Sequence, residues 1–203
     1  MYRIIFATGN AGKMKEIREI LSDLGAEILS MKEAGIRADI VEDGNTFEEN
    51  ALIKAKAVAA LLPEGSNTAV LADDSGLEID YLDGEPGIYS ARYMGEDTSY
   101  RIKNANLIQR LAGVPVEKRT ARFVCAIAAA FPDGSTVIRR GVIEGKIGYE
   151  ERGENGFGYD PIFYLPDMSR TTAELSPEEK NYISHRGRAL QAVKEDLAER
   201  MKA

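Results

Sequence analysis

Residues 3–13 read Arg3-Ile4-Ile5-Phe6-Ala7-Thr8-Gly9-Asn10-Ala11-Gly12-Lys13, an apolar run followed by a glycine-rich turn that ends in lysine. The apolar run is typical of a buried strand. After the turn, apolar residues recur at the spacing of one helix face: Ile17, Ile20, Leu21 and Leu24. Gly25 then provides a natural helix stop. The stretch therefore predicts a strand, a tight turn and a helix over residues 14–24.

The turn has the chemistry of a phosphate-binding segment. The first N–H groups of a helix have no partner within the helix and carry partial positive charge, so a phosphate can bind there. Gly9 and Gly12 would let the main chain approach a ligand closely, and Lys13 would add a positive charge. The turn is not a P-loop, because only two residues separate its glycines and Met14 follows the lysine. An ordinary turn with a solvated lysine explains the same residues, so this motif does not decide the function alone.

The rest of the chain alternates between predicted strands and helices. Strands are expected at residues 27–30, 69–72, 121–131 and 136–147, the last two joined by a hairpin turn at residues 132–135. Helices are expected at residues 46–62, with a capping box of Thr46 and Glu49, at residues 99–111, from Ser176 onward, and from about Arg186 onward. Residues 32–45 are polar and irregular, so we expect a loop there.

This order of elements predicts an α/β fold with a mixed sheet flanked by helices. Residues 1–203 suit a single domain with two lobes around a shared core. Residues 84–116 could belong to the second lobe, and the sequence leaves the boundary between the lobes open.

The composition argues against some classes of partner. The formal net charge is -7. A duplex-binding protein normally has a basic face, so we do not expect a nucleic acid partner. No apolar run approaches the length of a membrane span and no signal peptide is visible, which predicts a cytoplasmic protein with no membrane partner. The single cysteine, Cys125, lies in an apolar run and is expected to be a buried, inert thiol.

Two aspartates follow the predicted strand at residues 69–72. Asp73 and Asp74 would therefore lie at the carboxyl end of a strand, where ligands of open α/β sheets bind. Neighbouring strand residues point to opposite faces, so only one of the two should face the site. Mg²⁺ takes one or two carboxylates plus substrate phosphates, and Glu42 could supply the second carboxylate from its loop. The alternatives are an Asx turn for residues 73–76 and a solvated loop acid for Glu42.

A helix face and two later segments add candidate binding residues. Asn50 and Lys54 are one helix turn apart, so they share a face and could reach one ligand, although a solvated flank explains either residue alone. Phe157-Gly158-Tyr159-Asp160 leaves the backbone open between two rings, which suits a flat heterocycle; a core strand that enters a turn is the competing interpretation. Lys180, His185 and Arg186 follow. Arg and His can hydrogen-bond a base carbonyl, but a lone histidine near a helix start is more often structural than catalytic.

Six motifs, taken in this order, resemble one protein family. They are Thr8-Gly9-Asn10 with Lys13, Thr46-Phe47-Glu48-Glu49-Asn50-Ala51, Ala72-Asp73-Asp74-Ser75-Gly76-Leu77, Pro86-Gly87-Ile88-Tyr89-Ser90-Ala91-Arg92, Phe157-Gly158-Tyr159-Asp160-Pro161 and Ser184-His185-Arg186. The chain is similar to the inosine triphosphate pyrophosphatase family (Ham1 type) from Ile4 to about Leu190. Six ordered motifs are far more specific than any one of them.

The resemblance implies a fold, an activity and a cofactor. The fold would be an elongated mixed sheet flanked by helices, with two lobes and a central active-site cleft. The activity would be hydrolysis of the noncanonical purine nucleoside triphosphates dITP, ITP and XTP to the monophosphate and pyrophosphate, which cleanses the nucleotide pool. The cofactor would be Mg²⁺, and members of the family are usually homodimers.

The resemblance also implies residue roles. Asp74 would be the proton acceptor and, together with Glu42, a metal ligand, with Asp43 as an alternative to Glu42. The remaining residues would contact the substrate: Thr8, Gly9, Asn10, Ala11, Gly12, Lys13, Lys54, Ser75, Phe157, Gly158, Tyr159, Asp160, Lys180, His185 and Arg186. Two rival functions are a pyrophosphatase for modified pyrimidine triphosphates and a noncatalytic nucleotide sensor. The complete set of metal and phosphate groups favours an enzyme over the sensor.

Overall fold

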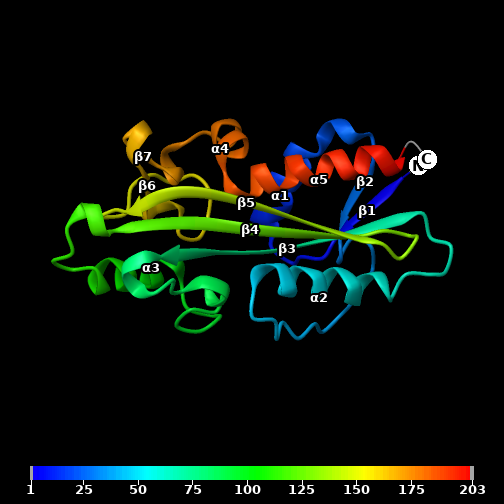
Figure 1. Ribbon diagram of the computed structural model, residues 1–203, viewed down its shortest axis with the longest axis horizontal. Coiled ribbons are helices and arrows are strands. Elements are labelled where there is room, and N and C mark those ends of the chain that lie inside the picture. The colour runs from blue at the N-terminus through cyan, green and yellow to red at the C-terminus, as the bar shows by residue number, and fades with distance from the viewer. Residues whose placement is uncertain (1, 202–203) are drawn as a thin grey trace. The chain divides into compact units, whose positions relative to one another are not determined.

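The computed structural model describes residues 2–201. Within them, seven strands form one sheet in the order β2-β1-β3-β4-β5-β6-β7 (Figure 1). Strand β1 pairs in parallel with both β2 and β3, whereas β6 is antiparallel to β5 and to β7. These pairings confirm the predicted α/β class and its mixed sheet flanked by helices.

Most elements lie where the sequence predicts them. The strands are β1 (Arg3–Phe6), β2 (Glu27–Ser30), β3 (Thr68–Ile79), β4 (Thr120–Ala130), β5 (Thr136–Ile147), β6 (Phe163–Leu165) and β7 (Arg170–Thr171). The α-helices are α1 (Ala11–Ile20), α2 (Phe47–Ala59), α3 (Tyr100–Arg110), α4 (Pro177–Ile183) and α5 (His185–Met201). None of the helices in the described part of the chain has the length and apolar character that a membrane span requires.

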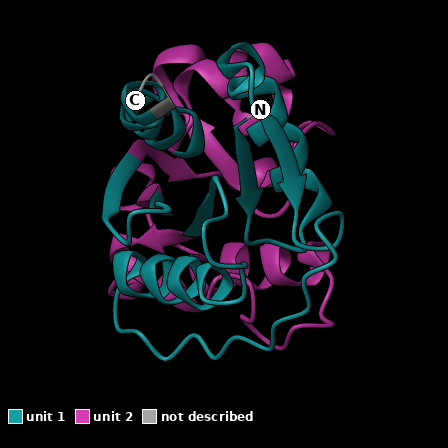
Figure 2. Cartoon of the chain, turned by 90° about the vertical axis from the view of Figure 1, so that its right-hand side faces the viewer, with its two compact units in different colours: residues 1–74, 125–141, 186–203 teal, residues 75–124, 142–185 magenta. Residues whose placement is uncertain are grey.

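The chain divides into two compact units (Figure 2). Unit 1 comprises residues 1–74, 125–141 and 186–203, and unit 2 comprises residues 75–124 and 142–185. Each unit is therefore assembled from separate pieces of chain. Residues 84–116, which the sequence assigns to a possible second lobe, lie inside unit 2.

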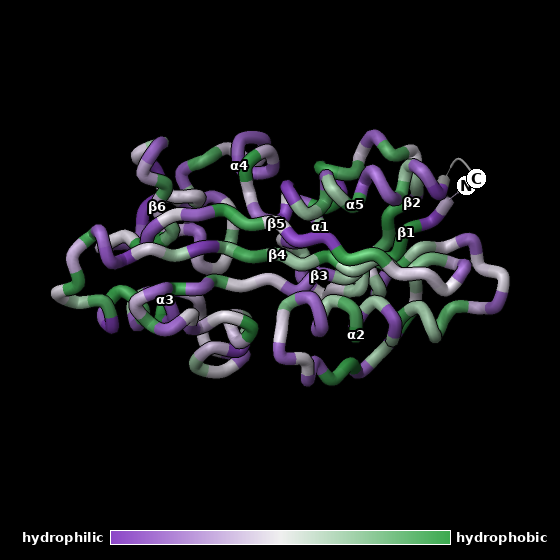
Figure 3. The backbone as a smooth tube through the Cα atoms, in the orientation of Figure 1, coloured by the Kyte–Doolittle hydropathy of each residue, from purple (hydrophilic) through white to green (hydrophobic). Residues whose placement is uncertain are grey.

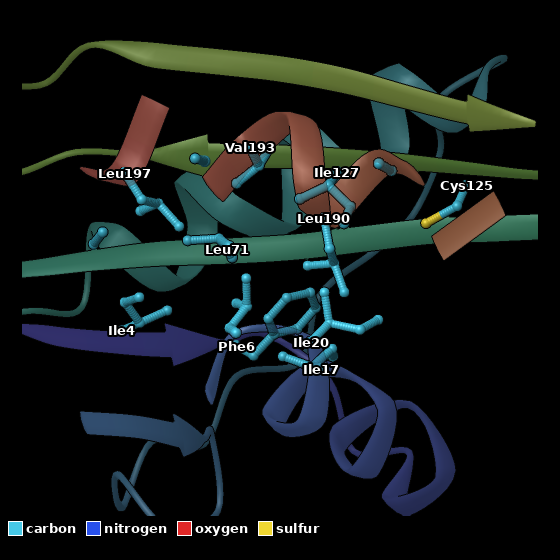
Figure 4. Packing of buried hydrophobic residues seen from close by; sticks show 14 of the residues in the cluster. Ile4, Phe6, Ile17, Ile20, Leu71, Cys125, Ile127, Leu190, Val193 and Leu197 are labelled. Carbon is cyan, nitrogen blue, oxygen red and sulfur yellow. The ribbon is translucent and has the colours of Figure 1, made fainter. Parts of the chain in front are cut away.

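The hydrophobic core of unit 1 is built by its strands together with α1 and α5. Figure 4 shows these side chains packed around Phe6 of β1 and Leu71 of β3. The tube of β1 is correspondingly hydrophobic in Figure 3. In Figure 1, α2 lies on the opposite side of the strands from α1 and α5. Because neighbouring residues of a strand point to opposite faces, adjacent residues of β3 meet different helices.

The hydrophobic core of unit 2 has its own aromatic centre. The rings of Phe123 and Phe163 lie 4.2 Å apart between centroids, and both side chains are buried. Arg119 is also buried, and its guanidinium donates to the backbone oxygens of Leu111, Ile147 and Gly148 at 2.6 to 2.8 Å. Since a buried charge is tolerated only when its donors have partners, these bonds explain how the core holds an arginine.

Helix α1 begins earlier than predicted. It starts at Ala11 rather than residue 14, because the side chain of Asn10 accepts a hydrogen bond from the backbone N–H of Lys13 at 3.0 Å and caps the first turn. The α-helix ends at Ile20, and a short 3₁₀ turn continues to Leu24. Gly25 follows with a φ of 65°, as expected for a helix stop.

Strand β3 is much longer than predicted, and this corrects the interpretation of its aspartates. It runs from Thr68 to Ile79 and contains Asp73 and Asp74, so the aspartates do not follow the strand and the Asx turn at residues 73–76 is wrong. The sequence misleads because a run of polar residues usually ends a buried strand. Here the strand continues because the buried carboxylates have charged and amide partners, described below.

The capping residues of α2 are largely as predicted. Thr46 is the N-cap, and its hydroxyl accepts from the N–H of Glu49 at 3.1 Å. The carboxylate of Glu49 accepts from the N–H of Asn45 at 2.6 Å, one residue before the position that a capping box uses. The helix ends at Ala59, three residues before the predicted end, and irregular turns follow.

The hairpin and the start of α4 follow their sequence signals. Between β4 and β5, the carboxylate of Asp133 accepts from the N–H of Ser135 at 2.9 Å, and Gly134 has a φ of 81°. At the start of α4, Ser176 and Glu179 form a capping box with proline at the first helical position. These local signals therefore predict the element boundaries well.

Cys125 is buried in unit 1, and burial raises the pKa of its thiol to about 12. Because only the thiolate is nucleophilic, we expect the folded protein to resist a thiol-reactive reagent such as Ellman's reagent at about pH 8. The chain should be labelled once per molecule after unfolding in guanidinium chloride. Rapid labelling of the folded protein would show that Cys125 is accessible.

Candidate functional site

The predicted site residues fall into two groups, one in each unit, and each group is described by itself. Unit 1 contains the glycine turn, the two aspartates of β3 and Arg186, together with Glu42 and Lys54. Unit 2 contains the predicted base-binding residues: Ser75, Phe157, Gly158, Tyr159, Asp160, Lys180 and His185. Ser75 follows Asp74 directly in β3 and is half-buried.

The glycine turn of unit 1 is held by two side chains. The hydroxyl of Thr8 accepts from the N–H of Asn10 at 3.1 Å, and Asn10 in turn caps the N–H of Lys13. Ala11 and Gly12 lie in the first turn of α1. A Cβ built on Gly9 would meet no described atom within 4 Å, so packing within the chain does not require glycine there. Close approach of a phosphate to Gly9 stays a prediction that would explain the residue.

Asp73 lies in a buried network of charges on the α1 and α5 side of β3. Its carboxylate is 2.9 Å from the ammonium of Lys13 and 3.3 Å from the guanidinium of Arg186. The same guanidinium is 2.6 Å from the carboxylate of Glu16 on α1. Burial opposes ionisation of Asp73, but Lys13, Arg186 and Lys54 outweigh burial and hold the pKa of Asp73 well below its usual range. Asp73 is thus charged at neutral pH, where it anchors Lys13.

The pKa of Asp74, the next residue of β3, is shifted in the opposite direction from that of Asp73. Its carboxylate accepts a hydrogen bond from the side-chain amide of Asn50 on α2 at 3.1 Å. Burial raises the pKa of Asp74; Lys54 and Asn50 lower it, and the nearby charge of Glu42 raises it again. The result is a pKa above the usual value, which suits a carboxylate that must take up a proton. Asp73 thus pairs with residues of α1 and α5, whereas Asp74 bonds to Asn50 of α2, and the charge of Lys54 acts on both carboxylates. That only one of the two aspartates faces the site stays a prediction.

Glu42 and Lys54 complete the unit 1 group. The Glu42 carboxylate lies 3.0 Å from the Lys54 ammonium, so the loop acid is not simply solvated. Burial lowers the pKa of Lys54, but Asp73, Asp74 and Glu42 together raise it above its usual value and keep the lysine charged. Asp43, the alternative metal ligand, is exposed. The ion pair with Lys54 therefore distinguishes Glu42 from its neighbour.

The carboxylates of unit 1 suit a Mg²⁺ ion that also binds substrate phosphates better than a metal ion held by protein ligands alone. No group of three or more His, Cys, Asp or Glu side chains capable of holding a metal occurs among residues 2–201 as described. Mg²⁺ needs only one or two carboxylates when substrate phosphates supply further oxygens. Asp74 and Glu42 interact electrostatically and both lie near Lys54. Two hard oxygen donors that both act on Lys54 fit the predicted metal.

In unit 2, Asp160 holds the aromatic turn together. Its carboxylate accepts from the N–H of Phe157 at 2.9 Å, from the hydroxyl of Thr172 at 2.8 Å and from the ammonium of Lys180 at 2.6 Å. A Cβ on Gly156 would lie 2.2 Å from this carboxylate, so glycine is required there. The segment is a turn that leads into a 3₁₀ helix, and the strand follows only at residue 163, so the competing interpretation of a core strand at residues 157–160 is wrong.

The two rings of this turn have different surroundings. Tyr159 is buried, its hydroxyl donates to the backbone oxygen of Ser90 at 2.6 Å, and Tyr100 packs against it edge-to-face at 5.1 Å. Phe157 is only half-buried, and the ammonium of Lys180 lies 4.8 Å from its ring centroid. The structure therefore assigns Tyr159 to packing and leaves Phe157 as the ring with an accessible surface.

His185 and Arg186 are neighbours in sequence but have different kinds of partner. His185 is buried in unit 2 and stacks on Phe123, with ring centroids 4.9 Å apart and planes inclined by 20°. Arg186 is bound to the carboxylates of Glu16 and Asp73 in unit 1. Its predicted contact with a base stays a prediction, because these ion pairs place its charge in the network that anchors Lys13.

Sequence reasoning missed several residues that support the site. The sequence analysis assigns no role to Glu16 or to Thr172. Asn50 was noted for sharing a helix face with Lys54, but its bond to Asp74 was not foreseen. In each case the partner lies at least 12 residues away along the chain, so no local pattern indicates the contact. The one usable signal was the four-residue spacing of Asn50 and Lys54.

The site combines a capped glycine turn, two lysines held by carboxylates (Lys13 and Lys54) and two strand aspartates. These features define an α/β protein with a site suited to a phosphate-bearing ligand. Comparison with known proteins makes this specific: the chain belongs to the Ham1 family, whose sequence model matches residues 4–196. The dITP/XTP pyrophosphatase of Exiguobacterium sibiricum is 50% identical over 195 residues, which cover 96% of each chain.

Solved structures agree with this assignment. The HAM1 protein of Coxiella burnetii has a TM-score of 0.85 at 42% identity, covering 98% of this chain and 100% of its own. The Ham1 protein of Staphylococcus aureus has a TM-score of 0.84 at 42% identity, covering 98% and 99%. The similarity therefore extends over the whole fold, and the family resemblance inferred from the six motifs is confirmed.

Proposed function

We propose that this protein is a nucleoside triphosphate pyrophosphatase that hydrolyses dITP, ITP and XTP to the nucleoside monophosphate and pyrophosphate. Its membership of the Ham1 family and the printed names of relatives such as that of Exiguobacterium sibiricum support this activity. The structural observation that carries the proposal is Asp74, a carboxylate with a raised pKa beside Lys54 and Glu42. A carboxylate in this setting is suited to activate water next to a phosphate.

In the proposed reaction, water attacks the α-phosphorus and pyrophosphate leaves. The oxygen of water bonds to the α-phosphorus, and the bond from this phosphorus to the oxygen that bridges to the β-phosphate breaks. Asp74 accepts the proton that the water loses. Lys13 and Lys54 stabilise the negative charge that develops on the phosphate oxygens. Bound Mg²⁺, for which Asp74 and Glu42 are the proposed ligands, would neutralise phosphate charge.

The network of Asp73 prepares Lys13 for this role. A lysine on the first turn of a helix would otherwise sample many rotamers in water. The 2.9 Å ion pair with Asp73 fixes its ammonium before any substrate binds. A group that is already in place loses less conformational entropy on binding, so more of its interaction energy favours the bound phosphate.

We assign recognition of the base to groups of unit 2. Phe157 offers the accessible ring surface, and the ammonium of Lys180, which donates to Asp160, lies 4.8 Å from the centre of that ring. N–H groups such as those of Lys180 and His185 suit a purine with a keto group at position 6. Adenine has an amino group there, so a donor would be left without an acceptor, and loss of such pairing discriminates strongly. Guanine also has a keto group, so its exclusion needs contacts at position 2.

We also propose a cytoplasmic location and a homodimeric state. The cytoplasm is where a nucleotide pool supplies DNA and RNA synthesis, and an enzyme that removes noncanonical nucleotides acts on that pool. The homodimer follows from the family resemblance alone. Light scattering coupled to size-exclusion chromatography measures the mass in solution, and a mass near 22 kDa at working concentration would exclude the dimer.

A product assay tests the proposed function. Purified protein is incubated with Mg²⁺ and, in separate reactions, dITP, XTP, ITP, GTP, ATP or dUTP, and pyrophosphate and orthophosphate are measured separately. We expect pyrophosphate as the primary product, with dITP, XTP and ITP preferred over ATP and GTP. Orthophosphate as the primary product, or equal rates with ATP and ITP, would overturn the proposal. Preference for dUTP would favour the pyrimidine alternative, and nucleotide binding without turnover would favour the sensor.

A further inference from the structure

Asn50 joins the two segments that carry the proposed metal ligands. Its side-chain oxygen accepts from the backbone N–H of Gly44 at 2.9 Å, and its side-chain nitrogen donates to the carboxylate of Asp74 at 3.1 Å. Gly44 lies two residues after Glu42 in the same loop. Asn50 itself is 1% exposed, so water does not compete for either bond. One amide group thus connects the loop of Glu42 with strand β3.

Chemistry fixes the orientation of this amide. A backbone N–H can only donate, so the Asn50 atom that faces Gly44 must be the oxygen. An ionised carboxylate can only accept, so the atom that faces Asp74 must be the nitrogen. The two neighbours therefore agree on one orientation, and flipping the amide would break both bonds. Asn50 is held in a single position by the groups that it connects.

The backbone around Gly44 fits tightly against the same amide. A Cβ on Gly44 would lie 2.7 Å from the side-chain oxygen of Asn50 and 2.8 Å from the Cβ of Glu49. Helix α2 therefore approaches the loop so closely that only glycine fits. One helix turn further along, Lys54 binds the Glu42 carboxylate at 3.0 Å. The same face of α2 thus fixes the loop at two points, its main chain through Asn50 and its carboxylate through Lys54.

We propose that Asn50 is the positioning residue that holds Asp74 and the Glu42 loop in register for metal binding. This inference rests on the proposed function, because it assigns Asp74 and Glu42 to the metal. Asn50 itself does not bind the metal or the substrate; it sets the direction of one carboxylate oxygen of Asp74 and the position of the loop. Residues that orient metal ligands in this way typically change metal affinity or activity about 10- to 100-fold when replaced.

Two substitutions of Asn50 separate its two bonds. Asn50→Ala removes both. Asn50→Asp keeps the size and the acceptor for the N–H of Gly44, but it directs a second carboxylate oxygen at Asp74 in place of the N–H donor. Asn106→Ala is the matched control, because it also removes an asparagine amide from a hydrogen bond, here the one from Tyr93 in unit 2. The control should leave metal dependence unchanged.

The test combines direct binding with kinetics. Electron paramagnetic resonance measures free Mn²⁺ during titration of each variant in the presence of a nonhydrolysable dITP analogue. We expect Asn50→Ala to weaken Mn²⁺ binding and to raise the Mg²⁺ concentration for half-maximal turnover, each by about tenfold or more. The KM for dITP at saturating Mg²⁺ should change much less than these quantities. Asn50→Asp should fold with a lower melting temperature than the wild type, because its carboxylate repels that of Asp74, and it should lose turnover to a similar extent.

The outcomes distinguish this inference from the proposed function. If the wild type releases pyrophosphate from dITP and both Asn50 variants keep its Mn²⁺ affinity and Mg²⁺ dependence, the positioning role is wrong and the function stands. If the wild type has no pyrophosphatase activity, the proposed function fails, and the Mn²⁺ titration still decides whether Asn50 supports metal binding. If Asn50→Ala does not fold, the isosteric Asn50→Asp variant decides the question by the same titration.

Discussion

The Asp74→Asn variant should lose turnover of dITP by about 10³-fold, because general acid–base groups contribute about 10²- to 10⁴-fold and this residue is also a proposed metal ligand. Asparagine has the size of aspartate and can still accept the hydrogen bond from Asn50, which is 3.1 Å long in the native protein. Its amide cannot accept a proton from water at neutral pH. The variant should therefore fold and bind nucleotide while it fails to cleave it.

The stability of Asp74→Asn should equal or exceed that of the wild type. Burial raises the pKa of Asp74 and Glu42 adds to this, against the opposing effects of Lys54 and Asn50. A carboxyl group whose pKa is raised by folding binds its proton more tightly in the folded state, so ionisation at neutral pH destabilises the fold. Removing the charge removes this cost. Loss of activity without loss of stability is the signature of a functional residue.

Three measurements check this expectation. Pyrophosphate release at saturating Mg²⁺ gives turnover, calorimetric titration with a nonhydrolysable analogue gives nucleotide affinity, and urea unfolding gives stability. Asp23→Asn is the control, because Asp23 is an exposed acid of unit 1 that pairs only with Lys194 among its described ion pairs. Turnover of Asp74→Asn close to that of the wild type would remove Asp74 from the proton-acceptor role.

The local parts of this site could be predicted from the sequence. Thr46 and Ser176 are helix caps with short-range partners, and both are the residues that the sequence predicts. Asn10 is a cap that the sequence analysis does not predict, and α1 starts three residues before the expected position. The shared face of Asn50 and Lys54 follows from helix geometry alone. Capping and helix periodicity depend on neighbours within one turn, so a single sequence contains the information that specifies them.

The charged network could not be predicted, because its members are far apart in the chain. Arg186 is 170 residues from Glu16 and 113 from Asp73, and no periodicity relates such positions. The same network explains why β3 extends past Ala72. The sequence signal of the strand ends where polar residues begin, whereas the strand itself continues because those residues are neutralised in the folded protein.

The aromatic turn shows a different limit. Phe157 and Tyr159 flank the same glycine and look equivalent in sequence, yet Tyr159 is a core residue and Phe157 is half-buried. The distinction comes from the hydrogen bond between the Tyr159 hydroxyl and the backbone oxygen of Ser90. Because aromatic side chains serve both in cores and at ligands, only this tertiary contact separates the two roles.

The neighbouring substitution, Asp73→Asn, should have the opposite effect on stability and reduce the free energy of unfolding by about 3–5 kcal/mol, the usual cost of removing one partner of a buried ion pair. Asparagine leaves Lys13 without the carboxylate that lies 2.9 Å away and leaves Arg186 with only the Glu16 partner of its two described ion pairs. Although burial opposes the charge of Asp73, Lys13, Arg186 and Lys54 outweigh burial and lower the pKa of Asp73.

The direction of that pKa shift also fixes the pH dependence. A carboxyl group whose pKa is lowered by folding binds fewer protons in the folded state than in the unfolded state, so stability rises with pH in this window. The contribution of Asp73 is fully present above the ordinary aspartate pKa of about 4 and is lost as pH falls below it. Stability of the wild type should therefore fall on acidification below about pH 4, and Asp73→Asn should show a shallower slope there.

Adjacent aspartates make this comparison unusually well controlled. Asp73→Asn and Asp74→Asn make the same chemical change at consecutive positions of one strand, so they share secondary structure and differ mainly in which face of β3 they occupy. Urea unfolding at neutral and acidic pH should show Asp73→Asn destabilised and Asp74→Asn not. Equal stabilities for the two variants would mean that the Lys13 and Arg186 ion pairs do not hold Asp73 in its charged form. If the expected difference is found, Asp73 is a structural carboxylate and Asp74 a reactive one on the same strand. The helices that contact each residue, α1 and α5 for Asp73 and α2 for Asp74, then determine its role.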